Sequence, residues 1–124
     1  MTLKFLARKE EAEGIFSFLF QPPKHLRWEA GQYLSYTLPH PNPDKRGITR
    51  HFSIASAPFE KNVMVTTKIE PKKRSSFKKA LMRLPQGASI DGQGPHGSFV
   101  LEDPAQEFVF IAGGIGITPF RAIL

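Results

Sequence analysis

The feature that most constrains this fold is the final stretch of the sequence, residues 108–124, which reads FVFIAGGIGITPFRAIL. An apolar run over 108–112 gives way to three glycines within four residues and then to Thr118-Pro119. This order predicts a buried parallel strand, a glycine turn and a capped helix start. A complete strand–helix–strand unit needs about 30 residues, yet six residues follow Thr118. The sequence therefore predicts the start of a nucleotide-binding domain that the chain does not complete.

Residues 1–102 carry a different pattern, that of short antiparallel strands separated by proline and glycine. Runs typical of strands lie at 3–8, 15–21, 32–38, 51–54, 63–69, 89–93 and 98–101. One helix is expected to begin near Ser75-Ser76 and to end at the breakers Pro85 and Gly87. We therefore expect a barrel or sandwich domain over 1–102, a polar linker over 103–107 and the unfinished domain over 108–124.

The composition is consistent with one core and a non-secreted protein. The chain of 124 residues is 40% hydrophobic and contains eleven Phe, which is enough apolar surface for a single core. Charged residues near the start exclude the apolar core of a signal peptide, and no run reaches the length of a membrane span. A cytoplasmic protein with no membrane-spanning segment is therefore expected. The absence of cysteine excludes disulfides, thiol catalysis and a Cys-bound iron–sulfur cluster in this chain, and no metal site is predicted.

The net charge of +6 is concentrated in residues 68–83. A basic patch of this kind attracts phosphate, whether on a nucleotide, on a nucleic acid or beside an acidic partner protein. The alternative is a solvated basic face that binds no ligand. The charge alone does not choose between these interpretations. The basic residues of the patch are Lys68, Lys72, Lys73, Arg74, Lys78, Lys79 and Arg83.

Two short segments are candidate anion sites. In an extended strand, Arg50 and Phe52 share one face, so a guanidinium group can hold a phosphate beside a flat apolar ring. Ser53 points to the opposite side unless the backbone turns there. The helix start at Ser75-Ser76 offers free backbone N–H groups to a pyrophosphate, although simple N-capping explains these serines equally well.

Four motifs in this order resemble those of the ferredoxin–NADP reductase superfamily of flavin- and nicotinamide-dependent reductases. Gly31-Gln32-Tyr33 stands in the GQY position, and Arg50-His51-Phe52-Ser53 stands in the RxYS position with Phe for Tyr. Residues 94–99, GPHGSF, correspond to GPxGxF, and residues 112–119, AGGIGITP, correspond to AGGxGxTP. The resemblance therefore covers nearly the whole chain.

The resemblance implies a mainly β fold, in which a six-stranded antiparallel Greek-key barrel with one short helix binds FAD, with FMN as the less frequent alternative. Arg50 is expected to hold a flavin phosphate and Phe52 to pack against the isoalloxazine ring. Ser53 takes the catalytic position, with a hydrogen bond near flavin N5. His51 is counted with the cofactor-binding motif, at a position that varies in type, and its side chain is expected to be structural.

Further cofactor contacts follow from the same resemblance. The backbone of Thr67-Lys68-Ile69 is expected to pass along the flavin, and Ser75 or Ser76 is expected to begin the helix over the pyrophosphate. In the unfinished domain, Gly113, Gly114 and Gly116 would admit the dinucleotide backbone, and Thr118 would cap the helix that faces its phosphates.

The implied activity is that of an NAD(P)H-dependent FAD reductase. A hydride passes from NAD(P)H to FAD, and electrons then pass to an acceptor such as an iron–sulfur protein or a haem, either in an acidic partner protein or in another domain. This chain is expected to be a fragment that is inactive with NAD(P)H, because most of the nicotinamide site is missing.

A non-enzymatic alternative is a small barrel that binds oligonucleotides through the basic patch. Two features of the sequence weigh against it. Phe77 is the single aromatic residue within 68–83, and the AGGIGITP segment has no role in such a module. The flavin reductase interpretation expects no nucleic-acid partner.

Overall fold

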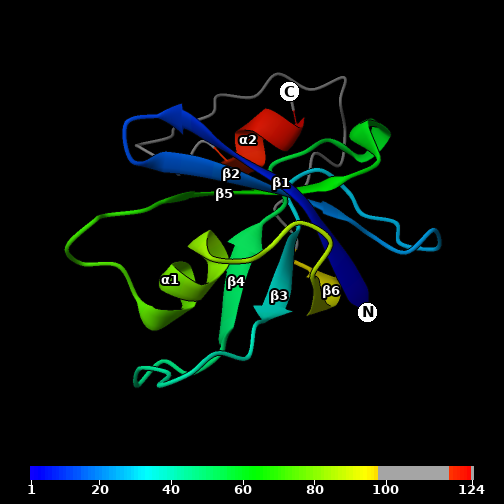
Figure 1. The fold of residues 1–124 in the computed structure, drawn as a ribbon. Helices are drawn as coiled ribbons and strands as arrows, with labels where there is room; N and C mark the ends of the chain where they lie inside the picture. Colours follow the sequence, from blue (N-terminus) through cyan, green and yellow to red (C-terminus); the bar gives the residue numbers. More distant parts are fainter. Residues whose placement is uncertain (98–117, 124) are drawn as a thin grey trace.

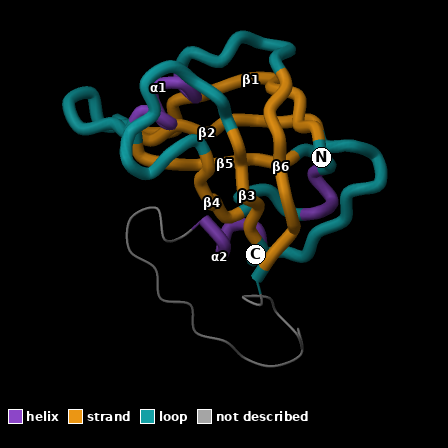
Figure 2. The backbone as a smooth tube through the Cα atoms, turned by 90° about the horizontal axis from the view of Figure 1, so that it is seen from below, coloured by secondary structure: helices purple, strands orange, loops and turns teal. Residues whose placement is uncertain are grey.

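The computed structural model describes residues 1–97 and 118–123, and its main element is a curled six-stranded antiparallel sheet. The strands follow the order β4-β3-β6-β1-β2-β5. Just beyond β4, the backbone N–H of Ala55 donates to the carbonyl of Met64 in β5 over 2.7 Å. This bond joins the two outer strands, and the resulting barrel is seen in Figures 1 and 2. The predicted six-stranded barrel is confirmed. Its strands are β1 (Thr2–Ala12), β2 (Ile15–Gln21), β3 (Tyr33–Thr37), β4 (Thr49–Ser53), β5 (Val63–Lys68) and β6 (Ser89–His96).

Three short helices accompany the described strands: η1 (Pro58–Glu60), α1 (Ser76–Met82) and α2 (Thr118–Ile123). The hydroxyl of Ser75 accepts a hydrogen bond from the backbone N–H of Lys78, so Ser75 is the N-cap of α1. The helix expected after Ser75-Ser76 is therefore confirmed. Figure 1 places α1 beside β4, whereas α2 lies on a different side of the barrel. Neither of the described helices α1 and α2 has the length and apolar character of a membrane-crossing helix.

The barrel interior is filled by alternate residues of the strands, as the period of two along a strand requires. Aromatic rings dominate it, and the ring centroids of Phe5 and Phe20 lie 5.6 Å apart. The largest fully buried side chains include Phe5, Phe18, Phe20, Leu3, Leu34, Tyr36, Val63 and Val65. Burial of these side chains against one another makes the barrel a packed core rather than a channel.

Strand β6 differs from its prediction. It continues through Gly94-Pro95, which the sequence analysis placed in a connection between two strands, and it ends at His96. Its pairing with β3 shifts between Tyr33 and Ser35, because Gly94 adopts a φ of 125° and accommodates an irregularity in the ladder. The expected strands 98–101 and 108–112, the linker 103–107 and the glycine turn lie outside the described residues. The domain boundaries stay a prediction.

The hydroxyl of Tyr36 is a buried polar group inside the barrel. It has no hydrogen-bond partner in the described structure, and burial raises the pKa of Tyr36. A buried hydroxyl without a partner lowers stability, so Tyr36→Phe is expected to raise the free energy of unfolding by about 1 kcal/mol. Urea unfolding of both proteins measures the difference. A lower midpoint in the variant would show that the hydroxyl has a partner after all.

Candidate functional site

Strand β4 carries the four residues of the RHFS motif on alternate faces. Arg50 and Phe52 lie on one face, and His51 and Ser53 lie on the other, because successive side chains of a strand point in opposite directions. The shared face of Arg50 and Phe52 agrees with the prediction. The site is built around these two residues and the start of α1.

Arg50 is a buried cation held in one orientation, with 6% of its surface exposed. Its Nη2 donates to Oδ1 of Asp44 over 3.1 Å. Its Nε is buried and has no partner in the described structure. A fixed guanidinium group with one buried donor left over can bind a further acceptor. Nη1 donates to the carbonyl oxygens of Arg46 (3.1 Å), Gly47 (3.0 Å) and Thr49 (2.9 Å).

Asp44 ties the loop between β3 and β4 to the start of α1. Its Oδ2 accepts the backbone N–H of Ser76 over 3.0 Å, and its own N–H donates to the Ser76 hydroxyl over 2.9 Å. His40 Nε2 lies 2.9 Å from the same hydroxyl. Arg50, this loop and α1 therefore form one hydrogen-bonded unit. The sequence analysis missed Asp44, and no local pattern marks it, because its partners are distant along the chain.

The carboxyl of Asp44 gives a pH prediction. The backbone hydrogen bond from Ser76 lowers the pKa of Asp44, with smaller contributions from the N–H of Arg46, the Ser76 hydroxyl and the charge of Arg50. Its contribution to stability is full above the ordinary pKa of aspartate, and it is lost as the pH falls through the lowered pKa of the folded protein. We expect Asp44→Asn to melt a few degrees below the wild type at pH 7.

Melting curves of both proteins between pH 7 and about pH 2 measure this effect. The difference should shrink only at the acid end of the range, where the wild-type carboxyl becomes neutral. A difference that stays constant across the whole range would contradict ionisation of Asp44 as its cause.

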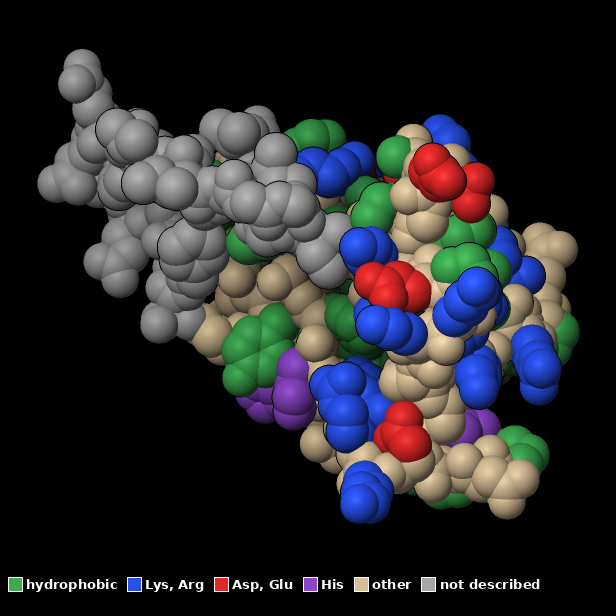
Figure 3. All heavy atoms as spheres, turned by 90° about the vertical axis from the view of Figure 1, so that its left-hand side faces the viewer, with side chains coloured by type: hydrophobic (Ala, Val, Ile, Leu, Met, Phe, Trp, Pro, Cys, Tyr) green, Lys and Arg blue, Asp and Glu red, His purple; other side chains and the backbone are tan. Residues whose placement is uncertain are grey.

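A basic groove lies between the β3–β4 loop, the end of β5 and the start of α1, with a volume of about 360 Å³. Figure 3 shows Lys and Arg side chains gathered on this side of the molecule around a few acidic ones. The single carboxylate that lines the groove, Glu70, is paired with Lys68 over 3.2 Å. Burial lowers the pKa of Lys78, whose Nζ donates to the Lys68 carbonyl over 2.7 Å. The groove therefore favours anions. Its lining residues are Arg46, Lys68, Glu70, Lys73, Arg74, Ser75 and Lys78.

Aromatic rings stand next to this charge. The half-buried ring of Phe52 lies 6.0 Å from the ring of Phe77 and 5.9 Å from that of Tyr36. The guanidinium carbon of Arg50 lies 5.4 Å from the centroid of the Phe77 ring. The buried ring of Phe77 therefore contacts both the cation of Arg50 and the ring of Phe52. The half-buried Phe52 shares a strand face with Arg50, an arrangement that suits a ligand with a flat ring and a phosphate.

The other residues of the RHFS motif point away from Arg50. Ser53 is half-buried at the end of β4, and its hydroxyl has no hydrogen-bond partner among the described residues. His51 is exposed, and its Nδ1 lies 2.7 Å from the Ser35 hydroxyl. This contact agrees with a structural role for His51.

Thr67, Lys68 and Ile69, which were expected to pass along the flavin, differ in whether their side chains reach the basic groove. The Lys68 side chain lines the basic groove. Thr67 and Ile69 are buried, so only their backbone can reach a ligand in the groove. The N–H of Ile69 already donates to the carbonyl of Gly14 over 2.7 Å.

The structure separates the two serines at the start of α1. Ser75 lines the basic groove, whereas the hydroxyl of Ser76 bonds to the β3–β4 loop. Thr118 is the first residue of α2 and is buried, so a helix begins at the predicted position, and its role as a cap stays a prediction. Gly113, Gly114 and Gly116 lie outside the described residues.

An unforeseen contact attaches α2 to the barrel. Arg121 donates to the carbonyl of Ala55 over 2.7 Å and binds both carboxylate oxygens of Glu60 over 2.9 and 3.0 Å. The hydrogen bond from Arg121 lowers the pKa of Glu60. The segment after β4 is thus held by β5, through the N–H of Ala55, and by α2, through Arg121.

The structure adds an argument against the oligonucleotide-binding alternative. Single-stranded nucleic acids bind by stacking bases on exposed aromatic side chains. Phe77, the aromatic residue of the basic patch, is 1% exposed and faces the core. Within the described part of the patch, no ring is available for stacking. A phosphorylated flat ring that lies over β4 fits the site better.

Comparisons with known proteins point to the same chemistry. The profile of the oxidoreductase FAD-binding domain family matches residues 7–101. The chain is 40% identical over 100 residues to the phenoxybenzoate dioxygenase subunit beta of Ectopseudomonas oleovorans, covering 78% of this chain and 29% of that protein. It is 36% identical over 105 residues to ferredoxin–NADP reductase B of Sorangium cellulosum, covering 82% of this chain and 40% of the relative.

Solved structures agree with the sequence relatives. The cytochrome P450 reductase GcoB of Amycolatopsis superposes with a TM-score of 0.80 at 26% identity, covering 99% of this chain and 38% of that one. Phthalate dioxygenase reductase gives a TM-score of 0.79 at 25% identity, covering 98% of this chain and 37% of that one. The chain thus spans about 29% to 40% of the length of these relatives.

Proposed function

Because the chain belongs to the oxidoreductase FAD-binding domain family, within the ferredoxin–NADP reductase superfamily, we propose that it holds FAD across β4, β5 and α1. The observation that carries this proposal is the buried Arg50, whose Nε has no partner among the described residues and which shares a face of β4 with the half-buried Phe52. Bound FAD supplies the capacity to take a hydride and to release single electrons. The protein supplies position and charge.

Each residue of the site has a physical role in this proposal. Arg50 and the cations of the basic groove neutralise the phosphates, which is why one buried donor of Arg50 remains open. Phe52 supports the flat ring by packing, without the hydroxyl that Tyr would bring to this position. Ser53 offers its hydroxyl to flavin N5, where it positions the reacting atom. Ser75 and the backbone of 67–69 complete the groove.

For the whole protein, we propose hydride transfer from NAD(P)H to FAD and electron transfer to an acceptor with an iron–sulfur cluster or a haem. Support comes from the relatives, which include the oxygenase reductase subunit of phthalate 4,5-dioxygenase from Pseudomonas putida. The basic face around α1 favours an acidic acceptor. A cytoplasmic location is part of the proposal, because the donor NAD(P)H is found inside cells.

Titration of the chain with FAD tests the cofactor proposal. We expect a shifted flavin absorption band and quenched flavin fluorescence, because the ring moves from water to a site beside Phe52. Circular dichroism confirms that the chain is folded during the titration. Unchanged FAD spectra in the presence of folded protein would contradict the proposal, and a parallel titration with FMN measures the preference for the dinucleotide.

Activity with NAD(P)H gives a further prediction for this chain of 124 residues. We expect turnover far below the roughly 1 per second of an ordinary reductase, because a dinucleotide site needs more chain than residues 108–124 supply. Oxidation of NADH and of NADPH, followed by absorbance, measures it. Reduction of the bound FAD with dithionite is the control for a competent flavin. Turnover of an ordinary reductase would contradict this expectation.

A further inference from the structure

A second hollow, here called the Trp28 pocket, lies between the loop after β2 and the η1 helix. Its volume of about 600 Å³ is within the usual range of small-molecule sites. It shares no lining residue with the basic groove, so the proposed FAD site leaves it unused. The lining residues that bear on its chemistry are Pro22, Lys24, Arg27, Trp28, Pro58 and Lys61, together with the acidic Glu60.

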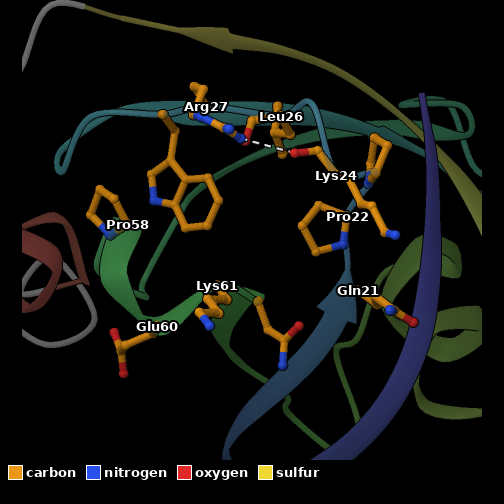
Figure 4. Close-up of a pocket in the computed structure, with 11 residues that line it drawn as sticks. Gln21, Pro22, Lys24, Leu26, Arg27, Pro58, Glu60 and Lys61 are labelled. Atoms are coloured by element: carbon orange, nitrogen blue, oxygen red, sulfur yellow. Dashed lines mark hydrogen bonds between the residues drawn. The ribbon is translucent and has the colours of Figure 1, made fainter.

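Part of the wall of this pocket consists of flat apolar rings. Trp28 is mostly buried, and its indole N–H donates to the carbonyl of Ser56 over 3.2 Å. The polar atom of the indole is therefore satisfied within the protein, and the ring offers apolar surface to the pocket. Figure 4 shows Pro22 and Pro58 on either side of the hollow, which adds two rigid rings to its walls. Surfaces of this kind favour a planar apolar ligand.

Cations surround this apolar surface. Lys24, Arg27 and Lys61 line the pocket, and none of them has an ion pair among the described residues. Nη1 of Arg27 donates to the carbonyls of Lys24 over 2.9 Å and Leu26 over 3.0 Å. These bonds fix the guanidinium group and leave its Nη2 and Nε donors without a described partner. Two parallel donors of Arg match the two oxygens of a carboxylate.

The one acidic lining residue does not cancel this charge. Glu60 binds Arg121 through both carboxylate oxygens, and one of these oxygens also accepts the N–H of Ala57. Its charge is therefore already neutralised by a cation that does not line the pocket. The net effect is a positive field at a partly apolar hollow lined by the exposed cations Lys24, Arg27 and Lys61, which favours an anion.

The pocket is preformed by local backbone contacts. The N–H of Leu26 donates to the Pro23 carbonyl over 3.1 Å, and that of Lys61 donates to the Pro58 carbonyl over 3.3 Å. Lys61 has a φ of 68°, which is unusual for a residue other than glycine. Such conformations persist where the surroundings hold them, and they are frequent at ligand sites. A rigid pocket binds without a large loss of conformational entropy.

We propose that the Trp28 pocket binds a small aromatic carboxylate. The ring of the ligand lies against the indole of Trp28 and the proline rings, and its carboxylate pairs with Nη2 and Nε of Arg27. Lys24 and Lys61 add electrostatic attraction from the rim. This binding goes beyond the proposed flavin function and does not depend on it, because the two sites share no lining residue.

Fluorine NMR with para-fluorobenzoate as the probe tests the proposal, with the chain saturated with FAD so that the basic groove is blocked. We expect a dissociation constant below about 1 mM and a change in the fluorescence of Trp28, the sole tryptophan of the chain. The neutral para-fluorobenzyl alcohol should bind at least about tenfold more weakly, because it cannot pair with Arg27. Arg27→Gln should weaken para-fluorobenzoate binding at least about fivefold.

The matched control is Lys9→Gln, which removes an exposed cation outside the pocket and should leave binding unchanged. The proposal is overturned if the alcohol binds as tightly as the carboxylate, if Arg27→Gln has no effect, or if the probe does not bind. Displacement of the probe by an acidic peptide at lower concentration than by benzoate would also overturn it in favour of a protein-docking surface. If FAD fails to bind, the same titration without FAD tests the pocket alone.

Discussion

Replacement of Arg50 by Ala is expected to weaken FAD binding by about 30- to 1000-fold. Loss of a buried charged hydrogen-bond partner of a bound anion costs about 2–4 kcal/mol, which corresponds to that range of affinity. The guanidinium group is buried and held by three carbonyl oxygens and Asp44, and its Nε has no partner among the described residues. Titration with FAD, followed by flavin fluorescence, measures the change.

The Arg50→Ala variant also leaves its internal acceptors without a donor, so it loses stability in addition to affinity. Arg50→Lys separates the two effects, because it keeps the charge and loses the planar fork. We expect this variant to fold and to bind FAD with an affinity between those of the wild type and Arg50→Ala. Arg83→Ala, in the basic patch but outside the basic groove, is the matched control. Equal FAD affinity in Arg50→Lys, Arg83→Ala and the wild type would argue against a phosphate contact of Arg50.

Replacement of Phe77 by Ala is expected to lower the free energy of unfolding by about 3–5 kcal/mol, because it removes a buried ring and leaves a cavity. Phe77 is 1% exposed and packs against Phe52, His40 and the guanidinium group of Arg50. Its loss therefore removes the support behind both the aromatic ring and the cation of the site. We expect FAD affinity to fall together with stability.

Urea unfolding measures the change in stability, with Phe59→Ala as the matched control. Phe59 is 83% exposed, so its removal should change stability by less than about 0.5 kcal/mol. If Phe77→Ala does not fold, the milder Phe77→Leu gives a graded value, expected below about 1.5 kcal/mol. Equal stability of Phe77→Ala and Phe59→Ala would contradict the assigned role of Phe77.

Local sequence signals predicted the elements that carry the site. The serine caps, the two-residue alternation in β4 and the proline and glycine breakers act over a few neighbouring residues. For this reason they predicted α1, the common face of Arg50 and Phe52, and the helix start at Thr118. The choice between Ser75 and Ser76 needed the structure, because it depends on which of them Asp44 contacts.

Longer-range contacts were not foreseen. Asp44 and Ser76 are 32 residues apart, and Glu60 and Arg121 are 61 residues apart. No periodicity or motif links such positions, since the chain brings them together only when the barrel closes. The prediction that the strand ends before Gly94-Pro95 was wrong for a related reason. The extent of β6 is set by its pairing with β3, which is distant in the sequence.

The sequence by itself determined a mainly β domain with a buried aromatic core and the four motifs of a flavin reductase, because alternation, caps and glycine turns are local properties of the chain. Only the tertiary structure decided that the buried Nε of Arg50 has no partner among the described residues, that Ser75 rather than Ser76 lines the groove, and that Trp28 lines a separate pocket with three cations. These features arise from contacts between segments that are distant in sequence, and closure of the barrel creates them.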